Sequence, residues 1–207
     1  MNAFTTLLDG YYRFRRQDYQ RQRERWSELA DGQSPPVMIV SCCDSRVDPG
    51  AIFDIGPGDA FVVRNVANLV PPYDQGPGLH GVASAIEFGV LGLGVRHIVI
   101  MGHASCGGIG AALSGADLGQ PGRSFVDDWI GLIKEPRDAV VADETIEDKQ
   151  LGLEQAAIRH SLTNLRSYPY VAEREAAAKL SLHGCHFGIA KGRLTVLDEE
   201  SGDFREE

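Results

Sequence analysis

The chain has 207 residues, of which 43% are hydrophobic and 24% are charged, so it can bury one substantial core and has the composition of a folded globular protein. Its formal net charge of -9 argues against a main role in neutralising nucleic-acid phosphates or coating an anionic membrane. No apolar run approaches the length of a membrane span, and the start of the chain lacks the basic and apolar regions of a secretory signal. We therefore expect a single cytoplasmic domain over residues 1–207, with no nucleic-acid or membrane partner.

The N-terminal segment combines arginines with aromatic side chains. Its arginines could form a nucleic-acid face, but Asp18, Glu24 and Glu28 dilute their charge. An amphipathic helix that packs its aromatic side chains on the body of the protein or on a partner subunit explains the pattern better. We expect residues 1–32 to form an N-terminal helical arm.

Short apolar runs after this arm are typical of buried parallel strands. The runs span residues 37–41, 60–63, 97–101 and 180–187. Helical stretches lie between them: one begins at Asp48 and Pro49, and others cover residues 79–91 and 151–165. Strands that alternate with helices predict an α/β sheet.

The end of the chain has a different pattern. A turn at residues 190–193 followed by the apolar run 194–197 predicts a hairpin, which adds an antiparallel edge strand to the sheet. The acidic residues 199–207 are expected to form a flexible tail.

One motif, from Gly76 to Gly81, has the G-x-G-x-x-G spacing of dinucleotide-binding sites. It follows Pro71, Pro72 and Asp74 rather than a strand, and no acidic residue stands about twenty positions further on, as that fingerprint requires. We interpret it as a loop that opens a helix.

The four cysteines favour metal binding or catalysis over a disulfide framework, given an intracellular chain of this size. Two segments stand out, Ser-Cys-Cys-Asp-Ser-Arg at 41–46 and Gly-His-Ala-Ser-Cys-Gly-Gly at 102–108, and each ends an apolar strand. Residues at the carboxyl ends of strands in an open α/β sheet can converge on one ligand. Cys42, His103 and Cys106 would then supply three ligands to zinc (Zn2+), with the fourth position left open for catalysis.

The neighbours of Cys42 support this interpretation. Asp44 can accept a hydrogen bond from metal-bound water, and Arg46 can hold that carboxylate ionised and oriented. The alternative roles for these two residues are a helix cap and a surface ion pair. Cys43 is the other candidate thiol, but successive strand side chains point to opposite faces, so we expect it to face away from the metal into the packed interior.

The pattern C-x-D-S-R, followed far downstream by G-H-x-x-C-G-G, resembles the β-class carbonic anhydrases. The likeness continues through residues 61–72, 85–88 and 161–165, and it covers most of the chain after Gln33. The resemblance implies an open, mostly parallel sheet of four strands plus an antiparallel edge strand, with helices on both faces. It also implies a homodimer or higher homo-oligomer whose active sites lie at the subunit interface.

By position, the resemblance assigns further pocket residues. Gln33 matches a glutamine that donates a hydrogen bond to bound substrate. Phe61, Val66 and Phe88 match the apolar wall around carbon dioxide, and Phe88 stands where plant-like members have a tyrosine.

The implied activity is the reversible hydration of carbon dioxide to bicarbonate and a proton, by attack of zinc-bound hydroxide. Relatives use the same constellation to hydrolyse carbonyl sulfide or carbon disulfide, and the sequence separates these activities poorly. A third hypothesis, a non-catalytic zinc protein with a redox or assembly role, predicts a closed metal shell.

The resemblance also bears on regulation. Some β-class enzymes close at lower pH, when bicarbonate binds a non-catalytic pocket of Trp, Arg and Tyr and the aspartate leaves its arginine to bind zinc. The matching positions here are Ile39, Arg64 and Phe187, so most of the polar grip on bicarbonate is missing. We expect the plant-like open form, in which Asp44 pairs with Arg46 and would bind the metal only in a closed, inactive state.

Overall fold

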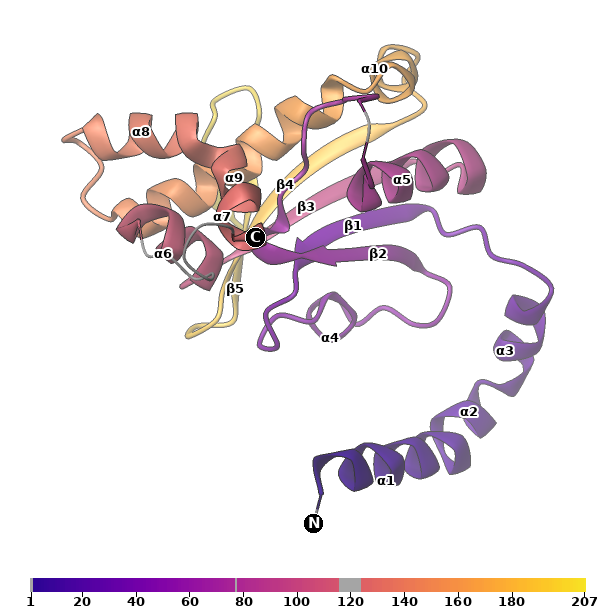
Figure 1. Cartoon of the computed structure of the whole chain (residues 1–207). Helices are drawn as coiled ribbons and strands as arrows, with labels where there is room; N and C mark the ends of the chain where they lie inside the picture. The colour runs from indigo at the N-terminus through magenta and orange to yellow at the C-terminus, as the bar shows by residue number, and fades with distance from the viewer. Residues whose placement is uncertain (1, 77, 116–123) are drawn as a thin grey trace. The chain divides into compact units, whose positions relative to one another are not determined.

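The computed structural model describes residues 2–76, 78–115 and 124–207 (Figure 1). The chain divides into two compact units, Met1–Ser34 and Pro35–Glu207. No helix of the described residues combines the length and the apolar character needed to cross a membrane.

The first unit is helical, as the sequence predicts for the N-terminal arm. The Asn2 side chain caps the first helix by accepting a hydrogen bond from the Phe4 amide at 2.9 Å. Aromatic side chains then hold the helices to one another, because the ring centroid of Trp26 lies 5.8 Å from that of Phe14 and 6.0 Å from that of Tyr19. The helices of this unit are α1 (Ala3–Arg16), α2 (Asp18–Arg21) and α3 (Arg23–Ala30).

A sheet in the order β2-β1-β3-β4-β5-β6 forms the centre of the second unit (Figure 1). Its first four strands along the chain are parallel to one another, β5 pairs antiparallel with β4, and β6 pairs antiparallel with β5 at that edge. The predicted parallel sheet with an antiparallel edge is thus confirmed. The strands are β1 (Val37–Cys42), β2 (Ala60–Asn65), β3 (His97–His103), β4 (Ser181–Gly188), β5 (Arg193–Leu197) and β6 (Phe204–Glu206).

The last strand differs from the flexible tail expected over residues 199–207. β6 pairs with β5, and the Arg159 guanidinium lies 5.0 Å from the centroid of the Phe204 ring. Arg159 also donates hydrogen bonds to the Gly202 carbonyl, and Arg193 pairs with Glu206 at 3.0 Å. These contacts tie the acidic end of the chain to the sheet.

Alternating side chains of the sheet divide the core between its two faces. Met38 and Val40 of β1 pack in one cluster with Ile86, whereas Ile39 packs in the other with Ile52. Figure 1 accordingly shows α4 and α5 on opposite sides of the sheet. The predicted helices on both faces are therefore present.

Two glycines of the sheet allow one helix to approach closely. A Cβ on Gly102 or on Gly184 would lie 2.7 Å from a side-chain carbon of Ile158, so α9 packs directly on β3 and β4. The helices of the second unit are α4 (Pro49–Ile52), α5 (Gly81–Glu87), α6 (Gly107–Ser114), α7 (Phe125–Ile130), α8 (Lys134–Ala142), α9 (Lys149–Arg166) and α10 (Pro169–Ala176). The described residues also form two 3-10 helical turns, η1 (Val66–Asn68) and η3 (Gly131–Ile133), and one π-helical turn, η2 (Phe88–Leu93).

The helix predicted over residues 79–91 has a different form. It begins at Gly81 as α5 and continues from Phe88 as the π-helical turn η2. Gly89 of this turn lies against β1, where a Cβ would come within 3.0 Å of the Met38 sulfur. Gly94 then ends the turn in the left-handed conformation, with φ of 69°. This segment is shaped by its contact with the sheet rather than by regular helical spacing.

Candidate metal centre

Three buried ligand side chains meet where β1 and β3 end. Cys42 is the last residue of β1, His103 is the last residue of β3, and these two strands are neighbours in the sheet. Cys106 follows as the residue that precedes α6. One ligand atom from each residue lies within 4.8 Å of the other two, and the two sulfur atoms are 4.0 Å apart. The described residues contain no other such group of Cys, His, Asp or Glu side chains.

A tight turn brings Cys106 back to His103. Ser105, between them, has a φ of 56°, which is a left-handed conformation that few residues other than glycine adopt. Arg46 supports the turn by donating a hydrogen bond to the Ser105 carbonyl at 3.1 Å. The backbone thus holds strain between two candidate ligands, His103 and Cys106.

The hydrogen bonds of His103 favour a metal ligand. Its Nδ1 lies 3.0 Å from the Ala104 carbonyl, so Nδ1 carries the proton and Nε2 has a free lone pair. Nε2 is buried and has no hydrogen-bond partner among the residues that the structure describes. Buried polar atoms rarely lack a partner, and a cation bound by this nitrogen and two thiolates would satisfy it. The donor set therefore fits zinc.

The two thiols are electrostatically unequal. The hydrogen bond from Cys106 lowers the pKa of the Cys42 thiol, and the same hydrogen bond, with burial, raises the pKa of Cys106. The pair is thus prepared to hold one thiolate beside one thiol. Binding of a dication would favour the second deprotonation as well.

Asp44 and Arg46 form a closely fitted pair on the loop after β1. Arg46 donates from Nε to one carboxylate oxygen of Asp44 at 2.9 Å and from a terminal nitrogen to the other oxygen at 2.7 Å. Its backbone amide adds a third hydrogen bond at 2.9 Å. These contacts hold the pKa of Asp44 well below its usual range. The nearer carboxylate oxygen is 4.0 Å from His103 Nε2, so the ionised group lies beside the ligands.

Comparison with known proteins assigns the family. A family model described as carbonic anhydrase matches residues 37–194. The chain is 34% identical to beta carbonic anhydrase 3 of Arabidopsis thaliana over 202 residues, which cover 96% of this chain and 78% of that protein. The chain belongs to the β-class carbonic anhydrases.

Other members of the family agree. The chain is 38% identical to beta carbonic anhydrase 5, chloroplastic, of Arabidopsis thaliana over 191 residues, which cover 91% of this chain but only 62% of that longer protein. The solved β-carbonic anhydrase CcaA superposes with a TM-score of 0.92 at 31% identity, over 100% of both chains. A tetrameric β-carbonic anhydrase of Sordaria macrospora superposes with a TM-score of 0.82 at 29% identity, over 96% of this chain and 98% of that one.

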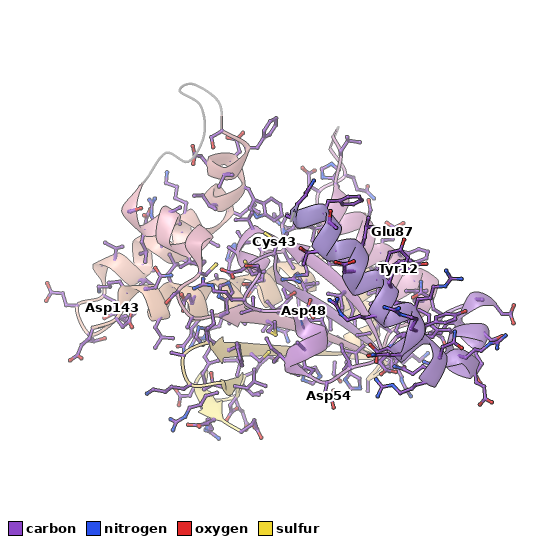
Figure 2. The ribbon with its side chains drawn as sticks, turned by 90° about the horizontal axis from the view of Figure 1, so that it is seen from below. Tyr12, Cys43, Asp48, Asp54, Glu87 and Asp143 are labelled. Atoms are coloured by element: carbon purple, nitrogen blue, oxygen red, sulfur yellow. The ribbon has the colours of Figure 1, made fainter. Side chains whose placement is uncertain are left out.

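Arg64 of this carbonic anhydrase chain clamps the loop that carries Asp44. Its Nε donates to the Cys42 carbonyl at 3.0 Å, and one terminal nitrogen donates to the carbonyls of Asp44 at 2.8 Å and Val47 at 3.2 Å. The other terminal nitrogen pairs with Asp48 at 2.9 Å, a residue that also caps α4. Figure 2 labels Cys43 and Asp48, which bracket this loop. All three guanidinium nitrogens are therefore engaged in holding the loop.

Two predictions about neighbouring residues can be compared with the structure. Cys43 lies outside the ligand group, as expected, but it is exposed rather than packed in the interior, because β1 ends at Cys42. Val66 lies close to the start of α6, which follows Cys106, since a Cβ on Gly108 would come within 2.8 Å of the Val66 side chain.

Phe61 and Phe88 do not join the ligands within one chain. Phe61 pairs in register with Met38, four positions before Cys42, which corresponds to about 13 Å along the strand. Phe88 packs near Phe61, with ring centroids 5.9 Å apart, and is 52% exposed. Gln33 belongs to the N-terminal unit. The pocket roles of all three stay predictions.

Glu154 of α9 was not among the site residues predicted from the sequence. This buried carboxylate accepts a hydrogen bond from the Cys106 amide at 3.0 Å and from the Gln150 side chain at 2.7 Å, and its other oxygen is 2.9 Å from His186 Nε2. Gln150 also donates to the Cys106 carbonyl at 3.1 Å. The available signal was the Glu154 carboxylate four positions after the Gln150 amide, on a helix whose inner face is mainly apolar.

Glu154→Ala should weaken zinc retention about 10- to 100-fold, because groups that orient a ligand contribute on that scale. The substitution frees the Cys106 amide and leaves the buried His186 without its partner. Competition with a chelator measures the affinity. Thr163→Ala, on the exposed side of the same helix, is the control. Equal zinc affinity in Glu154→Ala and the wild-type chain would refute this role.

Proposed function

We propose that this chain holds one zinc ion through Cys42, His103 and Cys106 and catalyses the reversible hydration of carbon dioxide. The observation that carries the proposal is the buried cluster of two sulfur atoms and the unpartnered Nε2 of His103. Three protein ligands leave one tetrahedral position for water or substrate, which is the arrangement of catalytic rather than structural zinc.

Cys42, His103 and Cys106 would hold zinc, which would supply a nucleophile by lowering the pKa of a water molecule. Two thiolate ligands offset most of the metal's charge, so the protein must assist. Asp44, kept ionised by Arg46, lies where it can accept a hydrogen bond from the attacking oxygen and orient its lone pair towards the substrate carbon. Cys106 precedes α6, whose amino-terminal dipole favours the thiolate form of this ligand.

The substrate pocket and the oligomer belong together in this proposal. Carbon dioxide carries no charge, so an apolar wall with few donors suits it. Val66 lies on the ligand side, whereas Phe61 and Phe88 are too far along the sheet to line the same pocket. We infer that a second copy of the chain brings its Phe61 and Phe88 to this pocket, in a dimer or larger assembly.

Surface features support association of copies. β2 is an edge strand of the sheet, and its Val62 is 40% exposed. Phe88 and Leu91 of the turn beside it are each 52% exposed. Exposed apolar side chains next to an unpaired strand edge are typical of an interface.

The same geometry favours an open site without the bicarbonate switch of some relatives. The guanidinium of Arg64 donates its hydrogen bonds to the loop after β1. The side chains of Ile39 and Phe187 have no polar groups that could bind bicarbonate. We expect activity to fall gently as pH falls, and inhibition by bicarbonate to follow a hyperbolic curve. Initial rates measured against pH and bicarbonate concentration test this. Steeply sigmoidal curves would contradict it.

Carbonyl sulfide hydrolysis is the competing activity on the same residues. Parallel assays of the zinc-loaded chain on carbon dioxide and on carbonyl sulfide distinguish the two. We expect hydration of carbon dioxide to be the faster reaction by a wide margin. A chain that hydrolyses carbonyl sulfide and leaves carbon dioxide unchanged would overturn the proposal.

A further inference from the structure

A second pair of ligand side chains lies at the amino ends of β3 and β4. His97 is the first residue of β3, and it pairs in register with Ser181, two positions before His183 of β4. Because residues two positions apart on a strand share a face, the two imidazoles lie on the same side of the sheet. Nδ1 of His97 is 3.1 Å from Nε2 of His183, and both residues are exposed.

This distance matches the spacing of two ligands on one metal ion. Metal–imidazole bonds of about 2.0–2.1 Å put two nitrogens about 2.9 Å apart at the right angle of square-planar Cu2+ or Ni2+, and about 3.3–3.4 Å apart at the tetrahedral angle of Zn2+. We propose that His97 and His183 form a second metal site, which binds a transition-metal dication such as Ni2+, Cu2+ or Zn2+ through these two facing nitrogens. Imidazole suits all three ions.

The protonation of the pair is compatible with binding. Without a metal, one ring donates its N–H to the lone pair of the other. Binding needs both lone pairs, so the donor ring must carry its proton on the opposite nitrogen, a change of tautomer that leaves it neutral, and the two exposed rings must turn until both lone pairs converge on the ion. Burial lowers the pKa of His183, and the nearby His97 lowers it further against the opposing effect of Glu199. This favours the neutral imidazole that a metal requires.

The site is separate from the catalytic one. His97 stands six positions before His103 on β3, which is about 20 Å along the strand. No third Cys, His, Asp or Glu ligand atom joins the pair among the described residues, so the remaining coordination positions are open to water. Such a site suits a metal that exchanges with solution rather than one that holds the fold together.

Equilibrium dialysis of the zinc-loaded chain against Ni2+ tests the proposal. We expect one Ni2+ per chain in addition to the zinc already bound. His97→Gln and His183→Gln should each weaken Ni2+ binding at least about tenfold, or about 1.4 kcal/mol. His160→Gln, a histidine of α9 outside this pair, should bind Ni2+ as the wild-type chain does. Because both sites are independent, carbon dioxide hydration should be unchanged in all three variants.

NMR of the wild-type chain tests the site without relying on variants that could fail to fold. Paramagnetic Ni2+ should broaden the imidazole NMR signals of His97 and His183 before those of His80 and His160. Equal Ni2+ binding by the wild-type chain and both pair variants would overturn the proposal. So would release of zinc in proportion to the Ni2+ taken up, or broadening that begins at another histidine.

Discussion

Cys42→Ala should abolish zinc binding and carbon dioxide hydration together, whereas Cys43→Ala should leave both intact. Cys42 is buried with its sulfur 4.0 Å from that of Cys106, and it completes the group with His103. Its removal leaves two protein ligands and opens the metal to water, while the exposed Cys43 lies outside the group. The neighbouring cysteine is therefore a matched control of the same residue type.

Metal analysis of the purified chains, with hydration rates on the same samples, measures the outcome. His103→Ala and Cys106→Ala should behave as Cys42→Ala does. Full zinc content in Cys42→Ala, combined with metal loss in Cys43→Ala, would show that the other thiol is the ligand.

Asp44→Asn should retain zinc but lower the hydration rate by about 10²-fold or more, the scale on which positioned proton acceptors act. The amide has nearly the shape of the carboxylate, but it lacks the charge that Arg46 stabilises through its bidentate contact. It also cannot offer two accepting oxygens, one to Arg46 and one to the attacking oxygen. Metal binding and catalysis should thus separate in this variant.

Asp54→Asn is the matched control, because Asp54 is exposed and adopts a left-handed conformation, with φ of 50°, that asparagine tolerates (Figure 2). Zinc content and the turnover rate of both variants should be measured together. Turnover of Asp44→Asn close to that of Asp54→Asn would remove Asp44 from the mechanism.

The sheet and the ligand group were accessible from sequence for a shared reason. Strands buried on both faces have continuous runs of apolar residues, so the positions of β1 and β3 could be recognised in the sequence. The carboxyl ends of neighbouring parallel strands meet, and this fact alone places Cys42 near His103. The short spacing between His103 and Cys106 then limits where the third ligand can lie.

Other features depend on contacts between distant parts of the chain. β6 pairs with β5, and its Phe204 contacts Arg159 of α9; an acidic end of a sequence gives no sign of that contact. Glu154 is a charged residue on a helix, which is normally exposed, and only the tertiary structure brings it to the Cys106 amide. For Phe61 and Phe88, the resemblance gave positions along the chain, and their pocket roles stay predictions.

Stopped-flow measurement of carbon dioxide hydration by the zinc-loaded chain tests the central claim most directly. The proposed site predicts hydration far above the buffer rate, loss of that rate when a chelator removes the metal, and its return when zinc is restored. Hydration no faster than buffer, in a chain shown by metal analysis to carry one zinc ion, would contradict the claim that Cys42, His103 and Cys106 form a carbonic anhydrase site.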